Sequence, residues 1–487
     1  MSTFSTLNGA LTSLIAQRQA LEVAGQNIAN VNTPGYTRQR GNLQAIEGSA
    51  AASMTSSSTA TLNGGVRVSS VDRLGDIFLE ARVRQETSSS AFLDAVAETY
   101  SLLESTIAEP GEKGLAAQLD TFFTSWQDVA NRPDDPAARA VLLENANTLV
   151  DRIASGYRAA ASQWESTRAQ AGALATDVNT AADAVADLNA RIKMITVSGG
   201  SPNALIDQRN QVLTQLSGLV GAEARPREDG TVDVMIGGNA LVRGENANHV
   251  EVTGASAFDT FMTDTATNTP NLIWTDAKNP VGATSGRLSG LVSVLAPEDA
   301  AGTGGPIAEL AQAYNDLAKR LGDTVNESHR TGFTLATTSS PARTGVEFFT
   351  GTTATTLKVN ISDVNDVAAA GSGLGALDGS VADAISRDLS MPAIDGTRKA
   401  GDVSALWSKR VVDLGVNSRT ATQRSTNAEA TRAVAEGLLT SQAGVNLDEE
   451  TINLMAYQRA YEAAARVITS VDEILDTLIN RTGIVGR

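Results

Sequence analysis

The sequence predicts a mainly α-helical protein with a β-rich insertion. Apolar residues recur at heptad spacing near both ends of the chain and in long stretches between them, which indicates amphipathic helices. From about Gly221 this pattern gives way to alternating apolar and polar residues and hairpin-type turns, which indicate strands. With 487 residues, 42% hydrophobic but only 4% aromatic, the chain can form two or more domains with cores of Leu, Val, Ile and Ala.

The first predicted element is an amphipathic helix over residues 4–28. Its apolar residues follow a four-three spacing and are Phe4, Leu7, Leu11, Leu14, Leu21 and Ile28. A turn follows this helix, because Pro34 disfavours a helical conformation at Thr33 and the pair Pro34-Gly35 suits the middle of a type II turn. We expect an extended chain over residues 36–43.

The next part of the chain predicts a helical hairpin. A Ser/Thr/Gly-rich loop over residues 54–65 leads into a short strand over 66–68, and the pattern becomes helical from about Ser90. Residues 174–195 keep heptad spacing almost without a break, which predicts a long helix. A Gly- and Pro-containing break separates it from a second helix over 205–216, which we expect to fold back.

The centre and the C-terminal end differ in pattern. Residues 231–236 alternate as a strand does, a helix is predicted over 307–329, and residues 331–402 form a Thr/Gly/Ser-rich, partly β segment. Helical pattern returns over 403–439 and again over 449–480. The apolar stripe of the last helix is broader than a two-position seam and includes Leu454, Tyr461, Val467, Ile468, Val471, Ile474, Leu475, Leu478 and Ile479.

Charge argues against nucleic acid and membrane as partners. The formal net charge of −17 repels phosphate backbones and anionic lipid headgroups. No apolar run approaches the roughly 18 residues that a membrane-spanning helix needs, and no Lys or Arg precedes Arg18 to begin a Sec signal peptide. The absence of cysteine fits a cytosolic protein and an exported one equally well.

The sequence carries no signature of catalysis, of a cofactor or of a metal site. Its two histidines, His249 and His329, are far apart and lie outside any known motif, so we expect structural or surface roles for both. Nucleotide-binding, zinc and hydrolase motifs are absent. The acidic run Asp448-Glu449-Glu450 could supply catalytic carboxylates, but it stands where negative charge stabilises the start of a helix, and we interpret it so.

One segment carries a specific resemblance. Residues 27–36 read Asn-Ile-Ala-Asn-Val-Asn-Thr-Pro-Gly-Tyr and resemble the Asn-x-x-Asn-x-x-Thr-Pro-Gly-Tyr pattern that flagellar rod, hook and hook-associated proteins carry after their first helix. A capped helix followed by a turn would explain Pro34 and Gly35 but not the whole string. The candidate motif residues are Asn27, Asn30, Asn32, Thr33, Pro34, Gly35 and Tyr36.

Other parts of the chain support the same family. Residues 445–454 and 457–463 resemble its C-terminal helix. Three interior segments resemble the hook-associated members: residues 199–209, the turn and strand over 229–232, and Gly-Arg-Leu-Ser-Gly-Leu over 286–291. Residues 331–402 resemble nothing that we can place.

The resemblance implies a fold in three parts. Both terminal segments, 1–45 and 446–487, would pair as a coiled-coil assembly domain. Residues 46–220 and 403–445 would form a long-helix bundle in the middle, and residues 221–402 an outward-facing β-rich domain with a helix near 307–329. The residues expected to carry assembly are Leu7, Leu11, Leu14, Leu21, Ile28, Leu454, Tyr461, Ile468, Val471, Leu475 and Ile479.

The resemblance also implies a structural role without enzymatic activity. The chain would polymerise in a helical array with copies of itself and form the junction between hook and filament, with hook protein and hook-associated protein 3 as neighbours. It would be exported by the flagellar type III apparatus without a cleaved signal peptide, and a flagellar export chaperone would hold its C-terminal helix beforehand. Because an isolated helix gains little stability in water, we expect the first helix to fold on assembly.

Two alternatives remain at this point. The first is a hook or distal-rod subunit of the same family, which the position of the protein along a flagellum would distinguish. The second is a secreted cell-wall hydrolase on a flagellar scaffold, with acidic residues of the central region doing acid/base chemistry. No paired-carboxylate motif supports the hydrolase.

Overall fold

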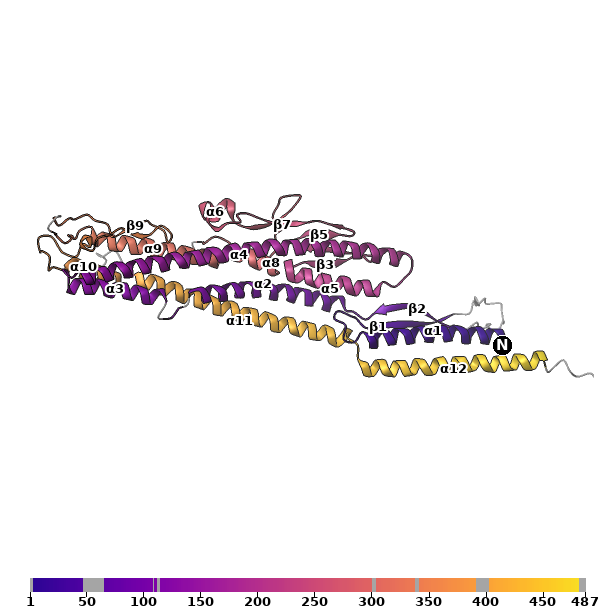
Figure 1. Cartoon of the computed structure of the whole chain (residues 1–487). Coiled ribbons are helices and arrows are strands. Elements are labelled where there is room, and N and C mark those ends of the chain that lie inside the picture. Colours follow the sequence, from indigo (N-terminus) through magenta and orange to yellow (C-terminus); the bar gives the residue numbers. More distant parts are fainter. Residues whose placement is uncertain are drawn as a thin grey trace, which may run out of the picture. The chain divides into compact units, whose positions relative to one another are not determined.

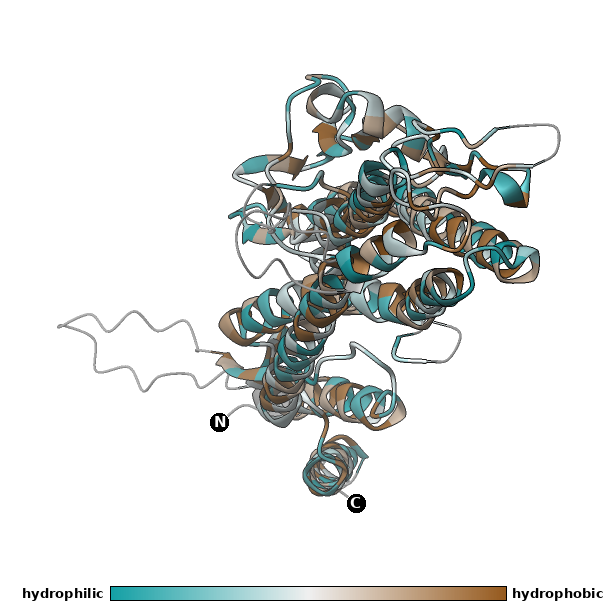
Figure 2. Cartoon of the chain, turned by 90° about the vertical axis from the view of Figure 1, so that its left-hand side faces the viewer, coloured by the Kyte–Doolittle hydropathy of each residue, from teal (hydrophilic) through white to brown (hydrophobic). Residues whose placement is uncertain are grey.

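The structure is a computed structural model that describes residues 3–46, 65–107, 109–111, 114–299, 304–337, 341–390 and 403–480. The predicted fold class is confirmed, because the described chain is mainly helical, its sheets are small, and its first and last helices contact each other. Figure 2 shows hydrophobic and hydrophilic residues alternating around the helices, as amphipathic helices require. By contacts the chain divides into two compact units, which are described separately below.

The first unit comprises Met1–Thr87, Asn179–Asn248 and Ala430–Arg487. Its helices are α1 (Thr3–Ala29), α5 (Asn203–Val220) and α12 (Leu447–Asn480), together with the start of α2 (Ile77–Ile107) and the ends of α4 (Pro136–Val197) and α11 (Val403–Ala443). Strands β1 (Gln39–Ile46) and β2 (Gly65–Arg73) form an antiparallel hairpin whose register shifts at Asn42/Leu43. An antiparallel sheet in the order β3-β4-β5-β6 contains β3 (Glu223–Pro226), β4 (Val232–Ile236), β5 (Asn239–Arg243) and β6 (Asn246–Ala247).

The second unit comprises Ser88–Val178 and His249–Glu429. Its core is built on the remaining parts of α2, α4 and α11, with α3 (Leu115–Asn131), α8 (Arg287–Val294), α9 (Pro306–His329) and α10 (Ser380–Ser390). Smaller elements complete it: β7 (Val250–Thr253) paired with β8 (Asn271–Trp274), β9 (Phe349–Thr350) paired with β10 (Lys358–Val359), the short helices α6 (Phe258–Thr263) and α7 (Thr265–Asn268), and a 3-10 turn η1 (Val364–Asp366).

Several predicted elements have their expected places. The predicted helix over 307–329 is α9, the predicted strand over 66–68 lies within β2, and the predicted long helix over 174–195 is the end of the much longer α4. The predicted loop over 54–65 falls almost entirely outside the described residues, as do residues 391–402 of the segment that resembled nothing. The division into a terminal, a middle and an outer domain stays a prediction.

His329 has the structural role predicted for it. Its side chain is fully buried between Trp126 and Phe348. The Ala368 N–H donates to Nε2 at 2.8 Å, so Nδ1 carries the proton and donates to the Val346 carbonyl, also at 2.8 Å. Burial lowers the pKa of His329 to about 4, and the neutral ring thereby fixes the segment after α9 to the aromatic core.

The family-like segment at residues 286–291 brings α8 very close to α2. Gly286 has a φ of +84°, a conformation that favours glycine, and its N–H donates to the Ser88 carbonyl of α2 at 3.0 Å. A Cβ added at Gly290 would lie 2.8 Å from the Phe92 carbonyl oxygen and 2.9 Å from the Ala95 Cβ. The glycines are therefore required for this helix crossing.

This crossing gives a first testable prediction. We expect Gly290→Ala to lower the free energy of unfolding by about 1 to 3 kcal/mol, because the added methyl overpacks a contact with backbone atoms that cannot move aside. Thermal and denaturant unfolding would measure the loss. The matched control is Gly415→Ala on α11, where no atom lies within 4 Å of the added Cβ, and a gain of about 0.5 to 1 kcal/mol in helix propensity is expected. Equal effects of the two substitutions would contradict the packing argument.

Candidate assembly site at the terminal helices

Helix α1 has two covered faces. It lies lengthwise against α12, and the hairpin β1–β2 runs along another side of it (Figure 1). A Cβ added at Gly65 of β2 would meet the side chain of Thr12, which places the hairpin against the face of α1 that contains Ala16, Ala20 and Val23. These small residues are buried, so the hairpin seam of α1 is made largely of alanine.

Helix α12 carries two apolar stripes that differ in exposure. Val471 is buried, together with Ala464, and the predicted residues Leu454, Tyr461, Ile468 and Leu475 are partly buried with the same heptad spacing. Since α1 is the main neighbour of α12, this is the stripe that α1 covers. The second stripe flanks the first, is exposed and consists of Ile452, Val467, Ile474 and Leu478, with exposed fractions of 42% to 62%. Leu478 follows Val471 by one heptad and lies at the border between the two stripes.

The predicted assembly residues do not all lie in the covered seam. On α1, Leu7, Leu14, Leu21 and Ile28 are partly buried, whereas Leu11 is 48% exposed and stands beside exposed Ile15. On α12, Ile479 is 74% exposed. The structure therefore brings most of these residues together within one chain, so α1 packs on α12 without a second subunit, contrary to the expectation that it folds on assembly, and Leu11 and Ile479 stay on the surface.

The motif residues surround a buried amide at the end of α1. Asn27 is 1% exposed, and its Nδ2 donates to the Gln39 carbonyl at 2.8 Å and to Glu450 Oε2 at 3.2 Å. Its Oδ1 accepts from the Tyr36 hydroxyl at 2.9 Å and from the Gln39 N–H at 3.0 Å. Every donor and acceptor of the Asn27 amide is thus used, which fixes both the turn and the first residue of β1.

The rest of the motif shapes the turn between α1 and β1. Asn30 Nδ2 donates to the Gln26 carbonyl, and the Thr33 hydroxyl donates to Asn30 Oδ1 at 3.2 Å. Gly35 has a φ of +78°, which favours glycine there. Asn32, Thr33, Pro34 and Gly35 are exposed. Burial, followed by the charges of Asp207 and Glu450, raises the pKa of Tyr36 to about 12, so its hydroxyl keeps the proton that it donates.

The C-terminal helix is attached to this turn by an ion pair. The Arg38 guanidinium donates to Glu450 Oε1 at 2.7 Å and to Glu449 Oε2 at 2.8 Å. The backbone N–H of Arg38 donates to the Ala443 carbonyl at the end of α11. Burial alone would lower the pKa of Arg38, but its hydrogen bonds and charge interactions with these two glutamates outweigh burial and raise it. The first and last thirds of the chain therefore meet at one point.

A second buried ion pair joins the same turn to α5 and α2. Asp207 accepts from Arg73 Nε at 2.5 Å and from the Thr37 N–H at 3.2 Å. Arg73 also pairs with Glu80 on α2 at 2.7 Å. Two residues later on α5, Arg209 donates to the Gly230 carbonyl at 2.8 Å and to Asn189 Oδ1, and burial lowers its pKa to about 10. Two of the segments that resembled the hook-associated proteins, 199–209 and 229–232, thus contact each other, and the first also contacts Thr37 directly after the motif.

Sequence reasoning missed these charged partners. The sequence pattern predicts that Asp448-Glu449-Glu450 stabilises the start of a helix by its charge. The cap itself is Asn446, whose Oδ1 accepts from the first turn of α12. Glu450 is 3% exposed and instead accepts hydrogen bonds from Asn27 and Arg38. A buried carboxylate needs a cation, and Arg38, two residues after the motif, was the signal that could have identified it.

The site has the properties of a structural joint, meaning the turn after α1 with the contacts among Asn27, Arg38 and Glu450, and of an assembly surface, not of a reaction centre. Within the described ranges, no group of three or more His, Cys, Asp and Glu side chains is placed to hold a metal ion. No helix in that part of the chain is long and apolar enough to cross a membrane. What the arrangement offers is a rigid turn that orients two terminal helices and an apolar surface along them.

Comparisons with known proteins agree with this arrangement. Residues 7–37 match a family model described as flagella basal body rod protein, and residues 437–481 match one described as the C-terminal part of flagellar basal body rod FlgEFG proteins. Residues 100–349, more than half of the chain, match the flagellar hook-associated protein FlgK helical domain. The terminal helices and their joint define a structural protein of the bacterial flagellum, not an enzyme.

Full-length relatives narrow this class. The chain is 27% identical to flagellar hook-associated protein 1 of Bacillus subtilis, covering 100% of both chains, and 27% identical to that of Escherichia coli, covering 98% and 99%. A solved structure entitled the flagellar hook junction protein FlgK from Burkholderia pseudomallei matches with a TM-score of 0.58 and 14% identity over 75% of this chain and 100% of that one, which shows a shared fold. The chain belongs to the FlgK family of flagellar hook-associated proteins.

Proposed function

We propose that this protein forms the junction between hook and filament outside the cell by polymerising through its terminal helices. The observation that carries the proposal is the second apolar stripe of α12, which stays exposed although the first stripe is covered by α1. Exposed Leu11 and Ile15 on α1 provide a different apolar surface in the same unit. Two unlike patches on one subunit allow head-to-tail contacts, which generate a helical array of identical subunits.

The proposed partners are those that membership of the family implies. In addition to copies of itself, the protein would contact hook protein at one rim and hook-associated protein 3 at the other. An export chaperone would cover the exposed stripe of α12 before secretion by the flagellar type III apparatus, because an exposed apolar stripe otherwise promotes association. A chain without cysteine can wait unfolded for export without forming disulfides.

The sharpest test places a charge on the exposed stripe. We expect Leu478→Asp to abolish incorporation into flagella, since burying an unpaired carboxylate in a subunit contact costs several kcal/mol and each ~1.4 kcal/mol is a tenfold loss of affinity. The purified monomer should keep the circular dichroism of the wild type, because Leu478 is 51% exposed. Cells should make hooks without filaments and lose filament protein to the medium.

Two further variants make this result interpretable. Thr469→Asp introduces the same charge on the opposite face of α12, given about 100° per residue, and cells carrying it should swim normally. Leu475 lies on the stripe that α1 covers and is already partly buried in one chain, so Leu475→Asp should disturb the monomer as well. Normal filaments on Leu478→Asp cells would refute assembly through this stripe, and imaging of labelled protein elsewhere than between hook and filament would refute the junction role.

A further inference from the structure

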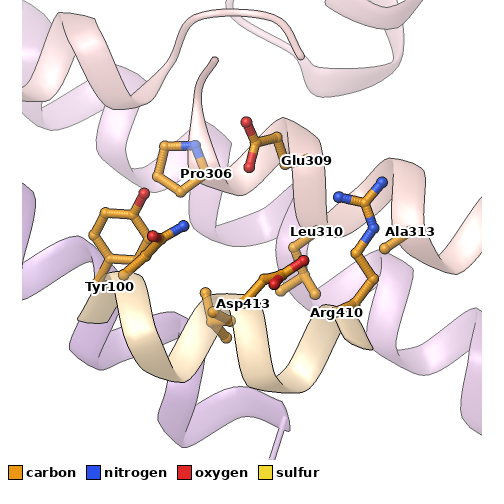
Figure 3. Close-up of a pocket in the computed structure, with 9 residues that line it drawn as sticks. Tyr100, Pro306, Glu309, Leu310, Ala313, Arg410 and Asp413 are labelled. Carbon is orange, nitrogen blue, oxygen red and sulfur yellow. The ribbon is translucent and has the colours of Figure 1, made fainter. Parts of the chain in front are cut away.

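A small cavity lies inside the second unit where α2, α9 and α11 meet. Its volume is about 40 Å³, and Tyr100, Glu309, Leu310, Arg410 and Asp413 are among the residues that line it (Figure 3). Glu309 comes from the first turn of α9, while Arg410 and Asp413 come from α11, whose Trp407 ring packs on Tyr314 of α9 with ring centroids 5.0 Å apart. The cavity therefore lies within the contact that holds α11 to α9.

One guanidinium in this cavity faces two carboxylates. Arg410 forms a loose ion pair with Glu298, with 3.6 Å between Nη2 and Oε1. Glu309 projects toward the same cavity (Figure 3), and its Oε1 is buried without a hydrogen-bond partner among the described residues. A buried carboxylate oxygen without a partner is costly when charged, whereas a proton on it removes most of that cost.

The acidic groups near Glu309 add to the cost of a negative charge on it. Glu298 and Asp299 precede α9 and are negative, and on α11 the carboxylate of Asp413 already pairs with Lys409 at 2.6 Å. From α2, Tyr100 contributes a neutral phenol whose pKa is raised by burial and then by the charge of Glu309. Burial in the first place, together with the charges of Glu298 and Asp299, outweighs the opposing charge of Arg410 and a hydrogen bond from the Gly304 backbone, and raises the pKa of Glu309 to about 7.

We propose that Glu298, Arg410 and Glu309 form a proton-dependent clamp between α9 and the N-terminal part of α11. With a proton on Glu309, Arg410 pairs with Glu298 and α11 docks over the cavity. Without that proton, the buried charge favours local opening, in which residues 403–417 separate from α9 and Glu309 becomes hydrated. This regulation concerns the stability of the second unit and does not rest on the proposed junction role.

The sign of the pH dependence follows from linkage. A carboxyl whose pKa is higher in the docked state than in the open state gives full stability below its ordinary pKa of about 4.5 and loses it as pH rises through about 7. Between these values the opening constant should rise by up to about tenfold per pH unit and then level off. Opening should therefore be rarest in mild acid.

Hydrogen exchange of the full-length protein tests this clamp. In the wild type, the protection factors of peptides covering residues 403–417, corrected for intrinsic exchange rates, should fall more than tenfold as pH rises from 5.5 to 8.5. Glu309→Gln should remove the pH dependence, since the amide cannot ionise. Glu298→Gln should move the transition to lower pH, because Arg410 is then free to stabilise charged Glu309. The matched control is Glu327→Gln, an exposed carboxylate on the same helix, which should behave as the wild type.

A direct titration keeps the test decisive even if a variant is unstable. Carbon-13 NMR of the glutamate side chains in the wild-type protein, with Glu309 assigned, should show the chemical shift of its carboxyl carbon changing with a midpoint near pH 7. A midpoint near 4.5 would overturn the proposal, as would wild-type protection that does not change with pH or a Glu309→Gln variant with the wild-type pH dependence.

Discussion

Replacing Asn27 by Asp is expected to detach α12 from the turn after α1 and to destabilise the terminal helices by about 3 to 5 kcal/mol. In the native structure Asn27 Nδ2 donates to Glu450 at 3.2 Å and to the Gln39 carbonyl. A carboxylate at the same place has no proton to donate and would face the buried Glu450 carboxylate directly. The two like charges would share the guanidinium of Arg38 and cannot both stay buried beside it.

The loss can be measured in the purified protein and in cells. Denaturant unfolding followed by hydrogen exchange should show α1 and α12 exchanging much faster than in the wild type, while α9 and the aromatic core of the second unit keep their protection. Asn30→Asp is the matched control, because Asn30 bonds only within its own turn to Gln26 and Thr33. If Asn27→Asp and Asn30→Asp lower stability equally, the Asn27–Glu450 contact does not hold the helices together.

Acidification is expected to destabilise the second unit through His329. Because burial lowers the pKa of His329 to about 4, this side chain binds a proton near pH 6.5 in the unfolded chain but only near pH 4 in the folded chain. The contribution of His329 to stability is full above pH 6.5 and is lost as pH falls toward 4, by about 3 kcal/mol in total. Protonation would also replace the Nε2 acceptor of the Ala368 N–H by a second donor.

The contribution of His329 is isolated by difference, since Glu309 titrates in the opposite direction over much of the same range. The free energy of unfolding of the wild type minus that of His329→Gln should fall steadily between pH 6.5 and 4. His249→Gln is the matched control for the loss of an imidazole at an exposed position, and its difference curve should lack the loss expected for the buried His329. A flat curve for His329→Gln would show that the ring is not held neutral by the fold.

The spacing of apolar residues predicted the helices well because it depends on which face of each helix is buried. The stripe on the last helix was broader than one seam, and the structure explains its width: Leu454 and Leu475 face α1, whereas Ile474 and Leu478 stay exposed. The hairpin-facing side of α1 went unnoticed because its residues are mostly alanine, and alanine carries little weight in an apolar pattern.

The charged contacts could not be predicted in the same way. The motif suggested that Asn27 and Tyr36 matter, but the sequence near them does not reveal Glu450 or Asp207 as partners. Local patterns specify turns and caps, whereas the pairing of buried charges depends on which helix ends meet in space. For the same reason Glu309 and Glu298 gave no sign in the sequence that they face one arginine.

The bond between Asn27 and Glu450 joins residues 423 positions apart, and this separation sets an order of events. Contacts between distant residues form late in folding, because the entropy of closing the intervening loop must first be offset by structure within it. Helix α1 is therefore fixed only after α12 has been synthesised. A chain cut short before residue 450 could form its long central helices, yet it would leave the Asn27 amide and the Arg38 guanidinium without Glu450. These contacts therefore distinguish a chain that contains α12 from one truncated before it.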